Sequence, residues 1–360
     1  MPRSYTWGEL TSAGPVSVRK MQDAPGEQFT VSAQPGGGAS TKSESAPSSE
    51  AVIDTAPWVE NPAPPSVARG EVIWHYTDAS GFAGIVESGC LWATALAFLN
   101  DREEFAYGLS IFDQSVDDAL ESFYVHPVQK EFLQSVMEAA RGVGRRLRTF
   151  VACASLASDS LAQWRGYSGG AGYAIGIDPE ADPVVLSDGG DDGLAYDAPD
   201  MSWRRVLYVR DEQIDLVNRT LGFVLKISPT PETMSNEFYW QRAVRLAAAQ
   251  VVTSSCYIKH PSFMEEQEVR SVLSVGEEEE GNIRRRVTPY GIAPYLRSAF
   301  IAPSSKREVP GKIYTAEMLP IKHLLLGPGP HGETRLQGAQ DILRSAGYNV
   351  DVKLSSSPFR

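Results

Sequence analysis

The chain reads Glu71-Val72-Ile73-Trp74-His75-Tyr76-Thr77-Asp78 at the point where globular sequence begins. The middle of this stretch is apolar, β-branched and aromatic, which predicts a buried strand that one histidine interrupts near its end. Its last two residues are favourable N-cap residues, and apolar residues at helical spacing follow as far as Gly89, which suits a helix end. Cys90–Ala93 then predicts a second strand. The pattern therefore places His75 at a strand-to-helix turn, where ligand-binding groups are often displayed.

The chain of 360 residues has the composition of a soluble globular protein, with 42% hydrophobic and 22% charged residues. Its net charge of −12 argues against general attraction to a nucleic-acid backbone, although a local basic patch would escape this argument. No apolar run approaches the length of a membrane span, and the N-terminus lacks the apolar centre of a signal peptide. The three widely spaced cysteines, Cys90, Cys153 and Cys256, do not predict a disulfide framework or a zinc cluster. We therefore expect a cytoplasmic protein without membrane contact or a bound metal.

Residues 1–68 differ in composition from the rest of the chain. The runs Gln34–Ser40 and Ser43–Ser49 are of low complexity, and three prolines follow between residues 62 and 65. Such sequence buries too little apolar surface to offset the entropy of ordering it. The composition predicts a disordered, solvated leader over 1–68 and a single folded domain over 69–360. A delivery segment of a secreted effector, or a tether to another module, is the alternative interpretation of the leader.

Hydrophobic periodicity predicts further strands and helices along the folded part. Ser160 precedes Gln163 by three residues, which is the pattern of a capping box. The glycines of Ser168–Gly172 lead into a strand rather than a helix, which excludes a dinucleotide fingerprint and a P-loop. Helices are predicted over 103–148 with breaks, 161–167, 212–226, 237–253 and 334–345, and strands over 149–155, 173–178, 205–209, 266–273, around Val287, within 318–326 and over 350–354.

A polar wall is predicted on the strand that begins at Glu266. Alternation along a strand places Glu266, Glu268 and Arg270 on one face. Charged residues in this pattern commonly form an exposed face with a cross-strand ion pair. Arg270 beside Glu268 could in the same way pair with it and make it structural.

The first stretch resembles the start of the ADP-ribosyltransferase domain of poly-ADP-ribosylating enzymes and their bacterial relatives. That start consists of a strand, a histidine, a small or aromatic residue, a serine or threonine, a helix, a small residue with glycine, and a second strand. The corresponding residues are Ile73–Thr77, Phe82–Val86, Gly89 and Leu91.

The layout from about residue 70 to 360 also resembles an uncharacterised bacterial family, catalogued as a domain of unknown function. The match to this family rests on several short motifs spread along the chain. They are His75-Tyr76-Thr77, Leu99-Asn100-Asp101 with Glu104, Asp159-Ser160-Leu161, Trp164, Tyr167, Phe263, Glu266, Glu268, Arg270 and Arg360.

The ADP-ribosyltransferase resemblance implies an α+β fold with a split pair of small antiparallel sheets and flanking helices. It implies an enzyme that cleaves the nicotinamide–ribose bond of NAD and transfers ADP-ribose to a macromolecule, protein or nucleic acid, or to water. This cleavage passes through an oxocarbenium-like transition state, which a carboxylate stabilises. The resemblance assigns that role to Glu268 and the orientation of the acceptor to Glu266.

The same resemblance implies a set of NAD-binding residues around this pair. His75 would bond the adenosine ribose, Tyr76 and Thr77 would contact NAD, and Ser155 resembles the serine of the middle motif. Nicotinamide needs an aromatic face to stack on. The candidates for that face are Tyr167, then Tyr173 and Trp164.

Other interpretations remain open at the level of the sequence. A single histidine near a strand end is commonly a hydrogen-bonded structural residue, and Trp164 is a natural core residue. The alternative function is a non-catalytic nucleotide- or protein-binding module on the same fold. A nuclease would need a metal-binding set of carboxylates, and none stands at a suitable spacing. A role as toxin, effector or phage-defence protein is suggested by analogy alone.

Overall fold

The computed structural model describes eleven stretches of the chain, and each structural statement below concerns these residues. Contacts group the chain from Asn61 to Arg360 into one compact unit. Residues 1–61, in which most of the predicted disordered leader falls, lie outside the described residues, as do Asn100, Asp101 and Arg360. The described stretches are 62–99, 102–143, 149–168, 171–186, 194–196, 202–230, 236–275, 281–288, 291–301, 313–315 and 318–358.

The structure is α+β, and its strands pair in a mostly antiparallel sheet. Among the described strands, only β12 and β13 pair in parallel. The helices are α2 (Ala79–Ser88), α3 (Arg102–Glu121), α4 (Pro127–Val143), α5 (Leu161–Tyr167), α6 (Arg210–Lys226), α7 (Glu237–Ser255) and α8 (Gly332–Ser345), with 3₁₀ turns η1 (Leu96–Phe98) and η2 (Pro261–Glu266). The strands are β1 (Ile73–Thr77), β2 (Leu91–Ala95), β3 (Thr149–Ser155), β4 (Tyr173–Ile177), β5 (Asp182–Leu186), β6 (Leu194–Tyr196), β7 (Arg204–Arg205), β8 (Glu268–Ser274), β9 (Arg284–Thr288), β10 (Gly291–Ile301), β11 (Ile313–Thr315), β12 (Ile321–Leu326) and β13 (Asp351–Leu354).

The first stretch folds as its sequence predicts. Strand β1 leads to Asp78, whose carboxylate accepts a hydrogen bond of 2.7 Å from the backbone N–H of Gly81 and so caps α2. Helix α2 ends at Gly89, whose φ of 63° lies in the left-handed region that glycine adopts without strain. Strand β2 follows at once. His75 therefore lies near the end of a strand, one turn before a helix.

The sheet divides at β3. One edge of β3 pairs with β8 over the full length of both strands. The other edge is shared: β2 pairs with it at Phe150 and Val151, and β1 pairs with it only at Ser155. From this edge one arm runs through β1, β4, β12 and β13, and a second arm runs through β2, β10, β5, β6 and β11. The sheet is thus a branched structure with β3 at the point of division.

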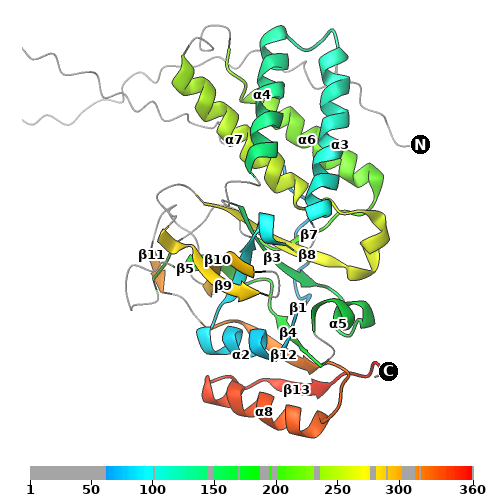
Figure 1. Cartoon of the computed structure of the whole chain (residues 1–360), viewed down its shortest axis with the longest axis vertical. Helices are drawn as coiled ribbons and strands as arrows, with labels where there is room; N and C mark the ends of the chain where they lie inside the picture. The colour runs from blue at the N-terminus through cyan, green and yellow to red at the C-terminus, as the bar shows by residue number, and fades with distance from the viewer. Residues whose placement is uncertain are drawn as a thin grey trace, which may run out of the picture. The chain divides into compact units, whose positions relative to one another are not determined.

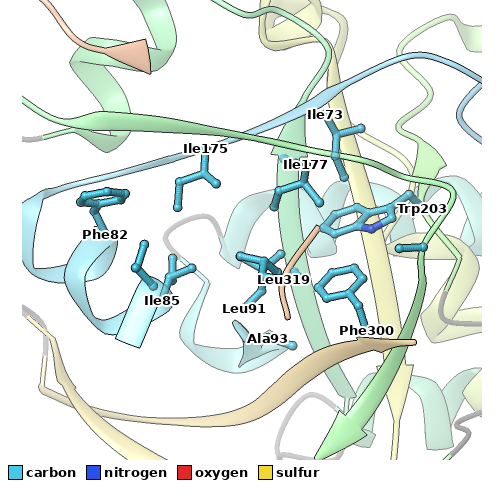
Figure 2. Packing of buried hydrophobic residues seen from close by; sticks show 14 of the residues in the cluster. Ile73, Phe82, Ile85, Leu91, Ala93, Ile175, Ile177, Trp203, Phe300 and Leu319 are labelled. Atoms are coloured by element: carbon cyan, nitrogen blue, oxygen red, sulfur yellow. The ribbon is translucent and has the colours of Figure 1, made fainter. Parts of the chain in front are cut away.

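The two faces of the sheet are covered differently. The core face carries Ile73, Ala152, Ala154 and Val269, whose side chains belong to the main hydrophobic cluster. Figure 2 shows this cluster, in which Phe82 and Ile85 of α2 lie beside residues of both arms. The opposite face, here called the bundle face, carries the intervening residues of β3 and β8. Helices α3, α4, α6 and α7 stand together beyond β7 and β8, whereas α2 and α8 lie at the opposite end, beside β12 and β13 (Figure 1).

Residues 62–68 correct the predicted extent of the leader. Their composition predicts disorder, but they pack on the folded unit. The backbone N–H of Val67 donates to the carbonyl of Trp203, and the carbonyl of Pro65 accepts from the N–H of Arg205. The carbonyl of Pro62 accepts from the side chain of Gln250 on α7. Prolines lack an N–H donor but keep a carbonyl oxygen that accepts strongly. A proline-rich composition therefore does not exclude such hydrogen bonds.

No helix among the described residues combines the length and apolar character that a membrane span requires.

Candidate functional site

Five charged side chains meet on the bundle face where β8 begins, and we call them the charge cluster: Glu104, Lys259, Glu266, Glu268 and Arg270. Four of them are buried, with exposed fractions of 1% for Lys259, 4% for Arg270, 7% for Glu268 and 8% for Glu104. Buried charges are tolerated only when they are paired. Three carboxylates against two cations leave one negative charge in excess when all five are ionised. Helix α3, the segment after α7, η2 and β8 together build this cluster.

Lys259 is the centre of the charge cluster. Its Nζ lies 2.5 Å from Oε1 of Glu104, 2.5 Å from Oε2 of Glu266 and 3.1 Å from Oε2 of Glu268. An ammonium has three N–H donors, so each carboxylate can receive one. Burial alone would lower the pKa of Lys259, but the carboxylates, Glu268 foremost, outweigh it and raise that pKa. Lys259 therefore stays charged and holds the three acids together.

Arg270 forms a bidentate pair with Glu268. Its Nε and Nη2 each lie 2.8 Å from one oxygen of the carboxylate. Its Nη2 also lies 2.5 Å from Oε2 of Glu104, and its Nη1 donates to the backbone oxygen of Cys256 at 2.6 Å. Burial would raise the pKa of Glu268, but Arg270 and Lys259 lower it to about 2. Both oxygens of Glu268 are occupied, so the structural pairing considered from the sequence is present.

Glu266 does not lie on the strand with Glu268, which corrects the predicted alternation. Gln267 between them has a φ of 45°, so the backbone turns through the left-handed region and β8 begins only at Glu268. The backbone oxygen of Glu266 accepts from Oγ of Ser155 at 2.6 Å and from Nε2 of Gln163 at 3.2 Å. Ser155 and Gln163 thus fix the position of Glu266. Gln163 is therefore not in a capping box, because the Ser160 side chain makes no capping bond and the Gln163 amide points elsewhere.

His75 satisfies a backbone group at the division of the sheet. Its Nδ1 lies 2.8 Å from the backbone oxygen of Cys153, a residue of β3 that pairs with neither β1 nor β2. A carbonyl only accepts, so Nδ1 carries the proton and Nε2 keeps a lone pair in the neutral ring. Burial lowers the pKa of His75 despite the opposing effect of that carbonyl. His75 is thus a neutral residue that bridges the gap between the arms.

The predicted aromatic residues lie in different places. The Trp164 ring is buried edge-on against Tyr76 at 4.7 Å, on the bundle face. Tyr173 stacks on Phe82 at 4.4 Å, on the core face. Tyr167 is 39% exposed, and its pKa is raised by burial and by the carboxylates of the charge cluster. Of the predicted aromatics, Tyr167 is the one beside the acidic pair.

The structure therefore does not gather the predicted residues into one pocket. Alternation places Thr77 with His75 and Tyr173 on the core face, whereas Tyr76, Ser155 and Glu268 face the bundle. Only the width of β3 separates the two groups, because His75 bonds the backbone oxygen of Cys153, and β3 pairs along its other edge with β8, which carries Glu268. The end of β3 is where the predicted residues come closest.

Sequence reasoning missed Lys259 as a member of the site. Its neighbours Cys256–Ile258 are apolar, and a lysine after such a run could have indicated a buried cation. Nothing local distinguishes it from a surface lysine, because its three partners come from distant or irregular segments. Tyr208, whose hydroxyl accepts from the backbone N–H of Glu268 at 3.0 Å, was missed for the same reason.

The pairing of Glu268 gives an expected pH dependence. Its pKa is about 2 in the folded protein against an ordinary value of 4.5, so it stabilises the fold above about pH 4.5 and this contribution is lost as the pH falls towards 2. Glu104 changes the pH dependence of stability in the opposite direction. Burial raises its pKa, so its contribution to the free energy of unfolding increases as the pH falls. We expect the free energy of unfolding in urea to fall more steeply with acidification in the wild type than in Glu268→Gln. Equal slopes would contradict the assigned pairing.

Among the described residues, no group of three or more histidines, cysteines or acids could hold a metal ion. The three acids of the charge cluster meet an ammonium instead. What the arrangement supplies chemically is a carboxylate in Glu268 that is fixed by its partners and has a lowered pKa, and a half-buried carboxylate in Glu266, beside the ring of Tyr167.

Comparison with known proteins gives one match. The model of the family described as Protein of unknown function (DUF2971) matches residues 163–271. No curated protein and no solved structure matches the chain. The matched region includes Lys259, Glu266, Glu268 and Arg270, four of the five members of the charge cluster. Over residues 163–271 the chain is therefore similar to DUF2971, which is consistent with the resemblance to an uncharacterised family expected from the sequence.

Proposed function

We propose that the protein cleaves the nicotinamide–ribose bond of NAD and transfers ADP-ribose to water or to a macromolecule. The observation that carries this proposal is the convergence of Glu266 and Glu268 on Lys259, across β3 from His75. The division of the antiparallel sheet into two arms at β3 also supports it, because the resemblance in sequence implies a split pair of sheets.

The geometry suggests a different division of roles between the two acids from the one that the resemblance implies. Both oxygens of Glu268 are held by Arg270 and Lys259. Glu266 uses only Oε2, and among the described residues nothing donates to its other oxygen. We therefore assign to Glu266 the contact with the ribose, and to Glu268 the role of a positioning residue that fixes Lys259. An ionised carboxylate beside the anomeric carbon stabilises the positive charge that develops there.

Nicotinamide release from NAD by the purified protein tests the proposal. We expect Glu266→Gln to lower kcat/KM by about 100-fold or more, because the lost interaction is made mainly in the transition state. Glu265→Gln is the matched control, since it removes the same charge from the exposed neighbouring residue. If the wild type releases no nicotinamide, with or without protein and nucleic-acid acceptors, the enzyme proposal is wrong.

A second function is favoured by one observation. The full pairing of Glu268 resembles a structural ion pair, which fits a non-catalytic nucleotide-binding module on this fold. Such a module would bind NAD or ADP-ribose without releasing nicotinamide, so calorimetry beside the release assay separates the two functions.

A further inference from the structure

Asp159 is a half-buried carboxylate between β3 and α5. Nε1 of Trp164 donates to it at 2.7 Å. Its other donors belong to the segment after β13, which we call the strap: Oγ of Ser355 at 2.5 Å, the N–H and Oγ of Ser356 at 2.9 and 3.0 Å, and Oγ of Ser357 at 3.2 Å. Among the described residues, no lysine or arginine pairs with this carboxylate. The strap therefore supplies most of the hydrogen bonds that hold Asp159.

The segment 155–163, which contains Asp159, also holds the turn at Glu266 and Gln267. Three of its groups donate to backbone oxygens of that turn. They are Oγ of Ser155 and Nε2 of Gln163, which donate to Glu266 at 2.6 and 3.2 Å, and the N–H of Leu156, which donates to Gln267 at 3.0 Å. The segment thus connects the strap to the turn that places Glu266 beside Lys259.

Two anchors fix the segment 155–163 away from that turn. The Tyr76 hydroxyl donates to the backbone oxygen of Ala157 at 2.7 Å and accepts from the N–H of Ser160 at 3.1 Å, which ties the segment to β1. The strap ties Asp159, which lies between these two points, to the end of β13 (Figure 1). Without the strap, the segment would keep the anchor to β1 and lose the one to β13.

The turn that the segment holds is strained. Gln267 has a φ of 45°, in the left-handed region that side chains other than glycine rarely adopt. Such a conformation persists only where the surrounding structure enforces it. The relaxed alternative is extended backbone, which would continue β8 back through Gln267 and place Glu266 on the strand, on the same face as Glu268. The hydrogen bonds from the segment 155–163 favour the turn over this alternative.

We propose that Asp159 is a positioning residue for Glu266, and that the strap acts through it to maintain the strained turn at Gln267. When the strap hydroxyls are lost, the segment 155–163 is less firmly held and its donors to the turn are weakened. Gln267 can then relax towards extended backbone, which withdraws Glu266 from Lys259. The catalytic consequence rests on the proposed function, whereas the coupling between the strap and the turn does not.

Hydrogen exchange of the full chain, followed by NMR, tests this coupling without NAD. The strap variant combines Ser355→Ala, Ser356→Ala and Ser357→Ala, which removes three of the hydrogen bonds to Asp159. We expect the amide of Leu156 to exchange about tenfold faster than in the wild type, or more, because its acceptor is the oxygen of Gln267. Amides within the pairing of β3 with β8 should keep their wild-type rates, which separates this effect from a general loss of stability.

The matched control replaces three serines whose hydroxyls bond backbone oxygens elsewhere in the fold. It combines Ser88→Ala, Ser110→Ala and Ser228→Ala. The control should leave the exchange of Leu156 unchanged. An unchanged rate in the strap variant, or an equal increase in the control, would overturn the proposal.

Gln267→Gly tests whether strain in the turn is the reason. Glycine adopts the left-handed region without strain, so the turn should then need less support from the segment 155–163. Adding Gln267→Gly to the strap variant should therefore return the exchange of Leu156 to near the wild-type rate. If the rate stays as fast as in the strap variant, the turn is not what the strap maintains, and the proposal is wrong.

Nicotinamide release by the same variants measures the effect on the proposed reaction. The strap variant should lower kcat more than it raises KM, and adding Gln267→Gly should restore kcat. Faster exchange of Leu156 in a protein that releases no nicotinamide would uphold the strap and refute the enzyme. Normal release by a strap variant with faster exchange would refute the positioning of Glu266 and leave the enzyme standing.

Discussion

Replacing Arg270 by methionine is expected to lower the free energy of unfolding by about 3–5 kcal/mol, the usual cost of removing one partner from a buried ion pair. The variant keeps much of the side-chain volume but leaves Glu268 and Glu104 facing Lys259 alone. It also removes the donor to the backbone oxygen of Cys256, which would then be buried without its partner. Urea unfolding followed by circular dichroism measures the loss.

Arg141→Met is the matched control for this prediction. Arg141 forms an ion pair with Asp113, but its side chain is 55% exposed, and exposed pairs contribute about 0–1 kcal/mol. A loss below about 1 kcal/mol in Arg270→Met would mean that water or a rearranged Lys259 compensates for the missing guanidinium, contrary to the assigned geometry.

Truncating Trp164 to alanine is expected to cost about 3–5 kcal/mol, as for other fully buried aromatic residues. The side chain is 2% exposed, and its ring packs against Tyr76 and against the backbone of Gly327, where an added Cβ would lie 2.6 Å from the ring. Its Nε1 donates to Oδ1 of Asp159 at 2.7 Å. The same carboxylate accepts from Ser355 and Ser356, so we expect the segment after β13 to loosen as well.

The Trp164→Phe variant distinguishes the contribution of ring packing from that of the indole N–H hydrogen bond. Phenylalanine keeps most of the packing and loses only the bond to Asp159, which should cost about 0.5–1.5 kcal/mol beyond the change in volume. Thermal or urea unfolding of both variants, with hydrogen exchange of residues 351–358, checks the expectation. If Trp164→Ala and Trp164→Phe lower the free energy of unfolding equally, the hydrogen bond to Asp159 and not the packing of the ring accounts for the stabilisation.

Local signals made the first part of the fold predictable. Strand β1, the Asp78 cap, helix α2 and the Gly89 stop all follow from residues close together in the sequence, and each is present. Strand β10 was not predicted, and Pro294 within it is a residue that argues against a central strand. In the structure Pro294 pairs only with Arg285 of the β9 hairpin, and the pairing with β2 and β5 begins after it.

The candidate site was predictable in part. The acids Glu266 and Glu268 stood out through their spacing, and Arg270 was recognised as a possible partner. The left-handed backbone of Gln267 carries no sequence signal, since glutamine rarely adopts it. The convergence of Glu104 and Lys259 on these acids depends on how α3 and the segment after α7 pack on β8, which no local pattern encodes.

The branch point at β3 has a consequence for how the chain can be divided. The region that matches DUF2971 ends within β8, and β3, the full-length partner of β8, lies before that region begins. Residues 163–271 expressed alone would carry only the first part of β8, without β3 along one edge, and Arg270 and Lys259 would lack Glu104. Such an edge invites aggregation. We therefore expect residues 163–271 of this chain not to fold on their own. During synthesis, β3 can complete its pairing with β8 only after the chain has been made as far as Ser274.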